Sequence, residues 1–258
     1  MSFKVSIIQS DLVWENIYQN LINFSKKFDS LEDDVDLVVL PEMFTTGFTN
    51  NSSDVAELMN GKTVNWMLQS AQKLNVAIAG SIIINENNHF YNRLIWAFPN
   101  GTYSFYDKRH LFRMGDEQDH FSAGTTRTII EYKGFRFLPL ICYDLRFPVW
   151  SRNCNDYDAL LYVANWPQTR ASVWKQLLPA RAIENQCYAI AANRVGVDGM
   201  NLTYSGDSMV VDFKGNTIAQ ANSNAEQILS INLDLEALQN FKEKFPAYLD
   251  ADKFNISL

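Results

Sequence analysis

Three side chains that could do chemistry each stand just beyond an apolar, strand-like run of the sequence. They are Cys142, which follows residues 137–141, together with Glu42 and Lys108. Open α/β sheets place reactive groups at the carboxyl ends of their strands, so these three residues can meet at one edge of a sheet. Each alone has a plainer interpretation: a core thiol, a capping or salt-bridging carboxylate and a solvated lysine.

The chemistry that this set supports is attack by a thiol on a carbonyl carbon. A thiol attacks as the thiolate, so Cys142 needs a lowered pKa or a base that takes its proton. Glu42 is the candidate base, because burial at a strand end would raise the pKa of its carboxyl group towards a useful range. Lys108 would hold Glu42 ionised and, with the backbone N–H of Tyr143, face the oxyanion formed on attack.

The elements that must position these residues alternate between strands and helices. Apolar runs predict strands at residues 4–9, 36–40, 76–84, 93–98, 102–106, 135–141, 159–163, 188–193, 208–213, 217–221 and 227–232. Helices are predicted at residues 17–28, 64–73, 173–186 and 235–242. Pro179 should kink or split the third helix near its start.

Both hairpins and crossovers are predicted between these elements. Turn signals at residues 99–101 and 214–216 predict hairpins, so the α/β fold should contain mixed sheets. Near-continuous apolar strands such as residues 76–84 need cover on both faces, which favours a two-sheet core with helices outside. Because there is no repeat or linker-like stretch, we expect one domain over residues 1–258. Residues 111–126 are charged and aperiodic, as in a functional loop or lid.

Composition and patterning argue against several classes of function. The net charge of -7 disfavours a nucleic-acid surface. No run reaches the length of a transmembrane helix, and the N-terminus lacks the apolar region and cleavage site of a signal peptide. Three cysteines without framework spacing fit a reducing compartment. We therefore expect a cytoplasmic protein with no nucleic-acid or membrane partner.

The sequence predicts neither a metal nor a cofactor. The 11 glycines form neither a dinucleotide-binding nor a phosphate-binding loop. His89, His110 and His120 have no metal-ligand spacing with a matching cysteine or carboxylate cluster. Cys154 is expected to be a loop thiol and Cys187 a core residue.

The segments around the three reactive residues resemble the signature blocks of the nitrilase superfamily. They read LPEMFTTGF at residues 40–48, YDKRHLF at 106–112 and ICYDLRFP at 141–148, and the similarity continues at 164–167, 180–186, 193–198 and 204–208. The resemblance covers nearly the whole chain, in order and at family-like spacing. It implies a four-layer α-β-β-α sandwich of the nitrilase type, a single carbon-nitrogen hydrolase domain and, usually, a homodimer.

Within this resemblance, each reactive residue matches a catalytic position. Glu42 matches the general base, Lys108 the catalytic lysine and Cys142 the nucleophile that forms an acyl-enzyme. Members often use a second glutamate after the lysine block, and the spacing of residues 117–124 makes Glu117 the candidate. Its implied role is to orient Lys108 and the substrate amide.

Residues 41–48, 110–117 and 165–167 look most like those of bacterial-type omega-amidases. That group hydrolyses the terminal amide of 2-oxo dicarboxylic monoamides such as 2-oxoglutaramate and 2-oxosuccinamate. The resemblance therefore implies a thiol amidase that needs only a small amide and water. Open alternatives are an aliphatic amidase, an N-carbamoyl hydrolase, a nitrilase, a Cys-His hydrolase with His110 as base, and a binding protein without activity.

The substrate of an omega-amidase carries a carboxylate away from the scissile amide, and burial of an unpaired carboxylate is costly. The planar fork of an arginine matches a carboxylate with two parallel hydrogen bonds. Arg170 is the first candidate for this contact and Arg113 the second, whereas Arg146 is expected to brace the turn against a neighbouring carboxylate. Phe44 and Trp166, each just beyond a strand end, are expected to wall the pocket.

Overall fold

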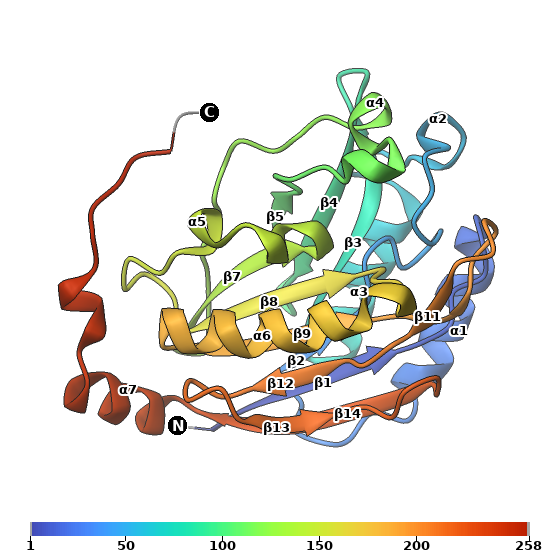
Figure 1. Cartoon of the computed structure of the whole chain (residues 1–258). Coiled ribbons are helices and arrows are strands. Elements are labelled where there is room, and N and C mark those ends of the chain that lie inside the picture. The colour runs from blue at the N-terminus through green and yellow to red at the C-terminus, as the bar shows by residue number, and fades with distance from the viewer. Residues whose placement is uncertain (1, 257–258) are drawn as a thin grey trace.

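The computed structural model describes residues 2–256 and has four layers. Two six-stranded mixed sheets pack face to face in its centre. Helices α1 (Ile17–Phe28) and α3 (Lys62–Leu74) cover the outer face of the first sheet, and α6 (Ala171–Asn185) lies across the second (Figure 1). The predicted α/β fold, a four-layer α-β-β-α sandwich, is confirmed.

The two sheets are built on the same plan. The first has the order β14 (Gln227–Asp234), β1 (Ser2–Gln9), β2 (Leu37–Val39), β3 (Ala77–Glu86), β4 (His89–Ala97) and β5 (Tyr103–Asp107). The second has the order β13 (Thr217–Gln220), β12 (Met209–Val211), β9 (Tyr188–Asn193), β8 (Ala159–Ala164), β7 (Phe135–Ile141) and β6 (Ile130–Tyr132). In each sheet the three central strands are parallel and the outer pairs antiparallel.

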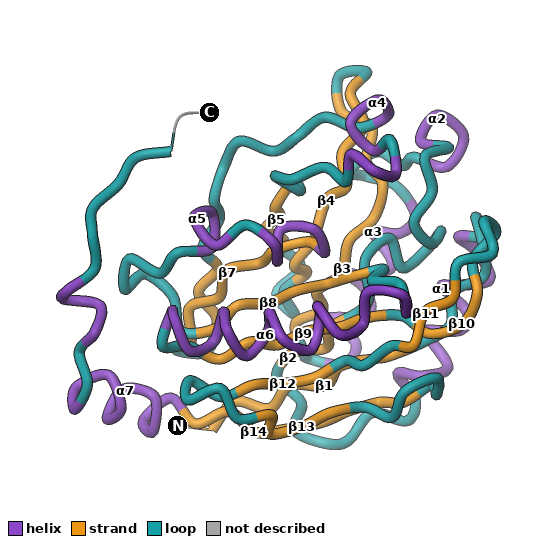
Figure 2. The backbone as a smooth tube through the Cα atoms, in the orientation of Figure 1, coloured by secondary structure: helices purple, strands orange, loops and turns teal. Residues whose placement is uncertain are grey.

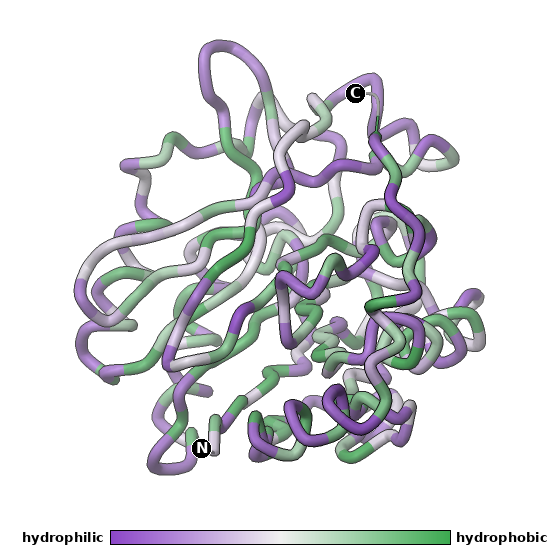
Figure 3. The backbone as a smooth tube through the Cα atoms, turned by 90° about the vertical axis from the view of Figure 1, so that its left-hand side faces the viewer, coloured by the Kyte–Doolittle hydropathy of each residue, from purple (hydrophilic) through white to green (hydrophobic). Residues whose placement is uncertain are grey.

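Successive side chains of strand β2 point to opposite faces of the first sheet and so into different layers. Leu37 and Val39 point into the core between the two sheets, whereas Val38 and Leu40 pack against the outer helices. Both faces of the strand are therefore buried, as its continuous apolar run requires. Figure 3 shows the same pattern for the molecule: hydrophobic residues line the inner strands, and hydrophilic ones gather in the peripheral loops.

The predicted strands and helices are all found, with shifts of a few residues at their ends. The last predicted helix is α7 (Leu235–Lys244). The predicted hairpin turns join β4 to β5 and β12 to β13, with Gly101 at φ +85° and Gly215 at φ +88°. The elements that were missed are short: β6, β10 (Val195–Val197), β11 (Thr203–Ser205), α2 (Ser52–Val55), α4 (Glu117–His120) and α5 (Pro148–Ser151). Segments of three or four residues are too short to show a period.

The expected split at Pro179 was wrong. Helix α6 continues through this proline from Ala171 to Asn185. Trp174 and Leu178 before it and Ala182 after it are buried in the main core. A proline inside a helix costs about 3 kcal/mol, and burial of large side chains such as Trp174 and Leu178 offsets that cost.

The predicted loop at residues 111–126 belongs to the connection from β5 to β6. It is largely irregular and carries the 3-10 helix η1 (Arg113–Gly115) and the single turn α4 (Figure 2). Glu117 at the start of α4 is nevertheless fully buried, so the loop delivers a carboxylate into the protein. Within residues 2–256, no helix is long and apolar enough to cross a membrane.

Candidate active site

The four side chains singled out by the sequence meet at the carboxyl ends of β2, β5 and β7. Lys108 follows β5, and its Nζ atom lies 2.9 Å from Oε1 of Glu42 and 2.9 Å from Oε1 of Glu117. Cys142 follows β7 and lines the same cavity as Lys108. All three charged side chains are almost completely buried, so they interact in a medium that screens charge poorly.

Two asparagines fix the carboxylate of Glu42. The backbone N–H of Asn165, just after β8, donates to Oε2 at 2.7 Å. Nδ2 of Asn92, in β4, donates to Oε1 at 2.8 Å. The sequence analysis gave neither residue a role, although a polar residue at the start of the apolar run 92–98 was a usable signal. With Lys108 as a third donor, Glu42 is held in one orientation.

Glu117 is fixed just as firmly. Its Oε2 accepts from the backbone N–H of Phe112 at 2.6 Å, and its Oε1 accepts from Lys108 at 2.9 Å. Burial raises the pKa of Glu117 above its ordinary value; the charge of Lys108 opposes this shift and that of Glu42 adds to it. Glu117 therefore shares the ammonium group of Lys108 with Glu42 and can orient it.

Lys108 stays protonated in this site. Burial acts to lower the pKa of its ammonium group, but the negative charges of Glu117 and Glu42 outweigh burial, so the pKa is raised above its usual value. Its Nζ also lies 5.3 Å from the ring centre of Phe48. The result is a fixed positive charge at the wall of the cavity.

The Cys142 thiol is neutral when the site is at rest. Burial raises the pKa of the thiol well above its usual range, and the charge of Glu42 adds to this, against the opposing charge of Lys108. Attack by Cys142 therefore requires a proton acceptor. Its backbone has φ +44°, in the left-handed region that non-glycine residues rarely occupy.

Asp144 braces the turn that holds Cys142. Its carboxylate accepts from the backbone N–H of Ile141 at 3.0 Å, from the hydroxyl of Tyr106 at 2.8 Å and from the backbone N–H of His110 at 3.0 Å. On the far side, Arg181 donates twice to the carbonyl of Leu145. These bonds over-determine the turn and so maintain the unfavourable backbone angle.

The expectation that Arg146 braces this turn was wrong. Among residues 2–256 it has neither an ion pair nor a side-chain hydrogen bond, and it lines the cavity with its guanidinium 5.3 Å from the ring centre of Trp166. Asp144 is not available to pair with Arg146, because its carboxylate is already hydrogen-bonded to other groups.

His110 is not placed to serve Cys142 as a base. Its Nδ1 lies 2.7 Å from Oδ1 of Asp144, and its ring stacks on Phe147 with 3.8 Å between the ring centres. It does not line the cavity, so the Cys-His alternative lacks the required geometry.

The cavity at Cys142 has a volume of about 190 Å³, and its wall is mostly apolar. Its lining comprises Phe48, Lys108, Phe112, Met114, Gly115, Cys142, Tyr143, Arg146, Asn165, Trp166, Pro167, Arg170, Leu202 and Tyr204. An apolar cavity with a few converging polar groups is the usual form of a small-molecule site. Trp166 and Arg170 line the cavity, as the sequence predicted. Tyr143, whose backbone N–H is the candidate oxyanion donor, lines it as well.

Phe44 and Arg113 lie outside this cavity. The ring of Phe44 is fully buried between the first sheet and its helices, with its centre 5.4 Å from that of Phe24. Phe48, four residues later, takes the expected place in the wall. Arg113 is exposed on η1, whereas its neighbours Phe112 and Met114 line the cavity.

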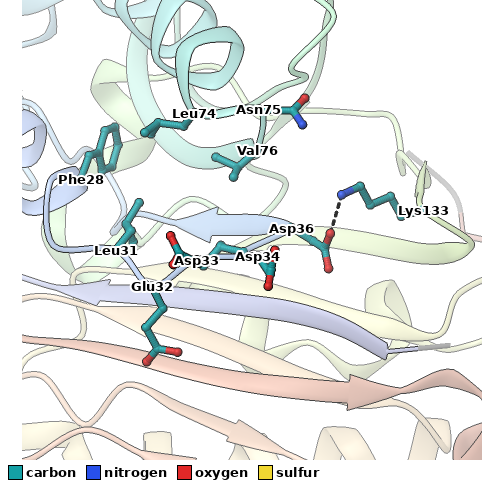
Figure 4. A pocket seen from close by; sticks show the side chains of 11 residues that line it. Phe28, Leu31, Glu32, Asp33, Asp34, Asp36, Leu74, Asn75, Val76 and Lys133 are labelled. Atoms are coloured by element: carbon teal, nitrogen blue, oxygen red, sulfur yellow. Dashed lines mark hydrogen bonds and ion pairs between the residues drawn. The ribbon is translucent and has the colours of Figure 1, made fainter.

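A second hollow lies at the other end of β2 and lacks comparable chemistry. Figure 4 shows Asp33, Asp34 and Asp36 around it, with Lys133 paired to Asp36. Asp36 precedes β2, whereas Glu42 follows it, so this hollow is at the opposite edge of the sheet from Cys142. Its lining contains no nucleophile, and no metal-binding group of His, Cys, Asp and Glu is found within residues 2–256.

The sequence matches a known enzyme family over most of its length. A model of the carbon-nitrogen hydrolase family matches residues 4–243, which is most of the chain. The chain belongs to the carbon-nitrogen hydrolase family. The resemblance to the nitrilase superfamily that the sequence motifs indicated is thereby confirmed. The protein is an enzyme of the carbon-nitrogen hydrolase class.

Similar proteins share this family along their full length. The chain is 47% identical to omega-amidase YafV of Escherichia coli over 98% of both chains, and 33% identical to the 2-oxoglutaramate amidase of Bacillus subtilis over 98% of this chain and 99% of the relative. The crystal structure of XC1258 from Xanthomonas campestris, a CN-hydrolase superfamily protein, superposes with a TM-score of 0.97, at 43% identity and over 100% of both chains.

Proposed function

We propose that this carbon-nitrogen hydrolase is an omega-amidase, which hydrolyses the terminal amide of 2-oxo dicarboxylic monoamides such as 2-oxoglutaramate and 2-oxosuccinamate. The observation that carries the proposal is a cavity lined by Cys142 and by Lys108, which is paired to Glu42, and also by two guanidinium groups that have no acidic partner among residues 2–256. The full-length similarity to omega-amidase YafV and to a 2-oxoglutaramate amidase supports the same substrate class.

Acylation begins when Glu42 takes the thiol proton of Cys142. The sulfur forms a bond to the amide carbon, and the carbonyl oxygen becomes an oxyanion that Lys108 and the backbone N–H of Tyr143 stabilise. As the carbon-nitrogen bond breaks, the nitrogen takes the proton held by Glu42 and leaves as ammonia. Glu117 holds Lys108 in place through this step, at 2.9 Å.

Deacylation returns the enzyme to its starting state. Glu42 takes a proton from a water molecule, whose oxygen attacks the thioester carbon. The carbon-sulfur bond breaks, the sulfur of Cys142 recovers the proton from Glu42, and the carboxylic acid leaves. The two half-reactions together convert one amide and one water into one acid and one ammonia, without a cofactor.

Arg170 and Arg146 are the proposed partners of the substrate carboxylate. Both line the cavity, and neither has an acidic partner among residues 2–256. Each guanidinium lies over an aromatic ring, Arg170 at 5.1 Å from the ring centre of Phe112 and Arg146 at 5.3 Å from that of Trp166. Stacking of this kind orients the planar fork and leaves its N–H groups available for an anion.

Arg170→Ala is expected to lower kcat/KM for an oxo acid monoamide about 10–100-fold, because hydrogen bonds to a charged group contribute about 1.5–3 kcal/mol. A neutral aliphatic amide of similar length should lose far less, since it has no carboxylate. Arg113→Ala is the matched control, because that arginine is exposed and outside the cavity. Equal losses on both substrates, or none, would remove Arg170 from carboxylate recognition; Arg146→Ala applies the same test to its neighbour.

The substrate class is tested by measuring ammonia and carbon dioxide release across a panel of amides, nitriles and carbamoyl amino acids. We expect the highest kcat/KM for 2-oxo dicarboxylic monoamides, with ammonia as the only gas-forming product. A preference for neutral amides would indicate an aliphatic amidase, and one for nitriles a nitrilase. Release of carbon dioxide together with ammonia would indicate an N-carbamoyl hydrolase. Each of these outcomes contradicts the proposed function.

The homodimer, the cytoplasmic location and the single domain over residues 1–258 stay predictions. The contact was predicted to involve residues 142–152 and the C-terminal strands. Val149 in α5 is 56% exposed and Ile183 in α6 is 54% exposed, which supports an apolar contact on this face.

A further inference from the structure

Asn165 donates two hydrogen bonds to Glu42. Its backbone N–H donates to Oε2 of Glu42 at 2.7 Å, and its Nδ2 donates to the backbone carbonyl of Glu42 at 2.6 Å. Since a carbonyl oxygen can only accept, the side-chain atom that faces it must be the nitrogen. The orientation of the Asn165 amide is therefore fixed by its partners.

The side-chain oxygen of Asn165 has no hydrogen-bond partner within the described residues. Its Oδ1 is buried and accepts no hydrogen bond within residues 2–256. The residue is only 6% exposed, and it lines the cavity together with Cys142 and Lys108. Buried polar groups in native proteins are almost always satisfied, so an unpaired acceptor on a residue that lines a cavity calls for a donor from outside the protein.

We propose that Oδ1 of Asn165 accepts a hydrogen bond from the nitrogen of the substrate's primary carboxamide, and thereby selects amides over esters. The inference rests on the proposed function and deepens it. A carboxamide offers one acceptor and two N–H donors. Its carbonyl oxygen has donors in Lys108 and the Tyr143 N–H, and Oδ1 of Asn165 is an unpaired acceptor that could receive an N–H.

Glu42 meets the substrate nitrogen as a proton donor in acylation, and Glu42 and Glu117 have few lone pairs left to accept from a further N–H. Their carboxylates are already occupied by Lys108, Asn92, Phe112 and Asn165, at 2.6 to 3.5 Å. An ester places an oxygen without a proton where the amide has its nitrogen. This oxygen would face Oδ1 as acceptor against acceptor, and the buried Oδ1 would stay unsatisfied.

The test compares an amide and a methyl ester that share one acyl group, so that both form the same thioester on Cys142. Asn165→Leu keeps the branched shape and removes Oδ1; the amide-to-ester ratio of kcat/KM is expected to fall about 10–100-fold. Asn165→Asp keeps an acceptor oxygen, so its ratio should stay near that of the wild type even where both rates decrease. A folded state is checked for each variant by thermal unfolding.

Asn92→Leu is the matched control, because Asn92 also donates to Glu42, at 2.8 Å, but does not line the cavity. It reports how far a loosened Glu42 changes the ratio by itself. If Asn165→Leu and Asn92→Leu lower the ratio equally, Asn165 is only a brace for Glu42 and the inference is overturned. If Asn165→Leu does not fold, the Asp variant decides: a ratio that falls with the acceptor retained contradicts the assignment. Wild-type enzyme that turns over no amide would instead overturn the proposed function.

Discussion

Cys142→Ala is expected to abolish amide hydrolysis and to leave the fold intact. Cys142 is the thiol in the described cavity lining, together with Lys108, and the alanine side chain leaves no atom that could form the acyl intermediate. Turnover should fall to background, while the melting temperature changes little, because the substitution removes only one sulfur atom. Activity is measured as ammonia release and folding by thermal unfolding.

The matched control is Cys154→Ala, since Cys154 is exposed in a loop and outside the cavity. It should retain wild-type turnover. Mass spectrometry of wild-type enzyme with a slow substrate should find the acyl adduct on Cys142 alone. An adduct on Cys154 or on the buried Cys187, or appreciable activity of Cys142→Ala, would contradict the nucleophile assignment.

The site's framework was predictable from sequence because each reactive residue directly follows an apolar run. A continuous apolar run predicts a strand that is buried on both faces. The first polar residue after the run then lies at the carboxyl end of that strand. Cys142 and Glu42 were found in this way, and the two remaining cysteines lie where expected, Cys154 in a loop and Cys187 in the core.

The rest of the site depends on which way a side chain turns after its strand, and sequence spacing does not determine this. Phe44 and Phe48 both follow β2, yet only Phe48 reaches the cavity. Arg146 was assigned to a turn brace because a carboxylate stands nearby in sequence, but Asp144 is satisfied by donors from β5 and the loop after it. Contacts between distant segments decide such cases.

Asn165 and Asn92 illustrate the same limit. Asn165 follows Glu42 by 123 positions and Asn92 by 50, and both hydrogen-bond to Glu42. Neither distance forms a motif that one sequence can show. The sequence predicted the charged groups of the site, whereas the neutral groups that hold them required the folded chain.

Lys108 supplies the positive charge that lies between two buried carboxylates. Its Nζ lies 2.9 Å from Oε1 of Glu42 and 2.9 Å from Oε1 of Glu117. Removal of one partner from a buried ion pair typically destabilises a protein by about 3–5 kcal/mol, since the remaining charge is left uncompensated. Without the lysine, the two buried carboxylates would face each other with no positive charge between them, and Glu42 would lose one of the donors that hold it in place.

Lys108→Met is therefore expected to reduce kcat by at least about 10²–10³-fold, the usual effect of losing one oxyanion donor, with a further loss from the loosened Glu42. The melting temperature should also fall. Lys133→Met is the control, because Lys133 is half-exposed and pairs with Asp36 at the opposite edge of the sheet. It should leave kcat unchanged.

The oxyanion and charge-balancing roles of Lys108 separate in the pH profile. Burial and the charge of Glu42 raise the pKa of Glu117, and the charge of Lys108 opposes this shift. If a proton held by Glu117 causes part of the loss, the residual activity of Lys108→Met should rise with pH, as Glu117 ionises, more steeply than in the wild type. A flat profile with the same loss would assign the whole effect to the missing oxyanion donor. Folded Lys108→Met with near-normal turnover would show that this buried ammonium group only holds two carboxylates together, and the proposed mechanism would then fail at its first step.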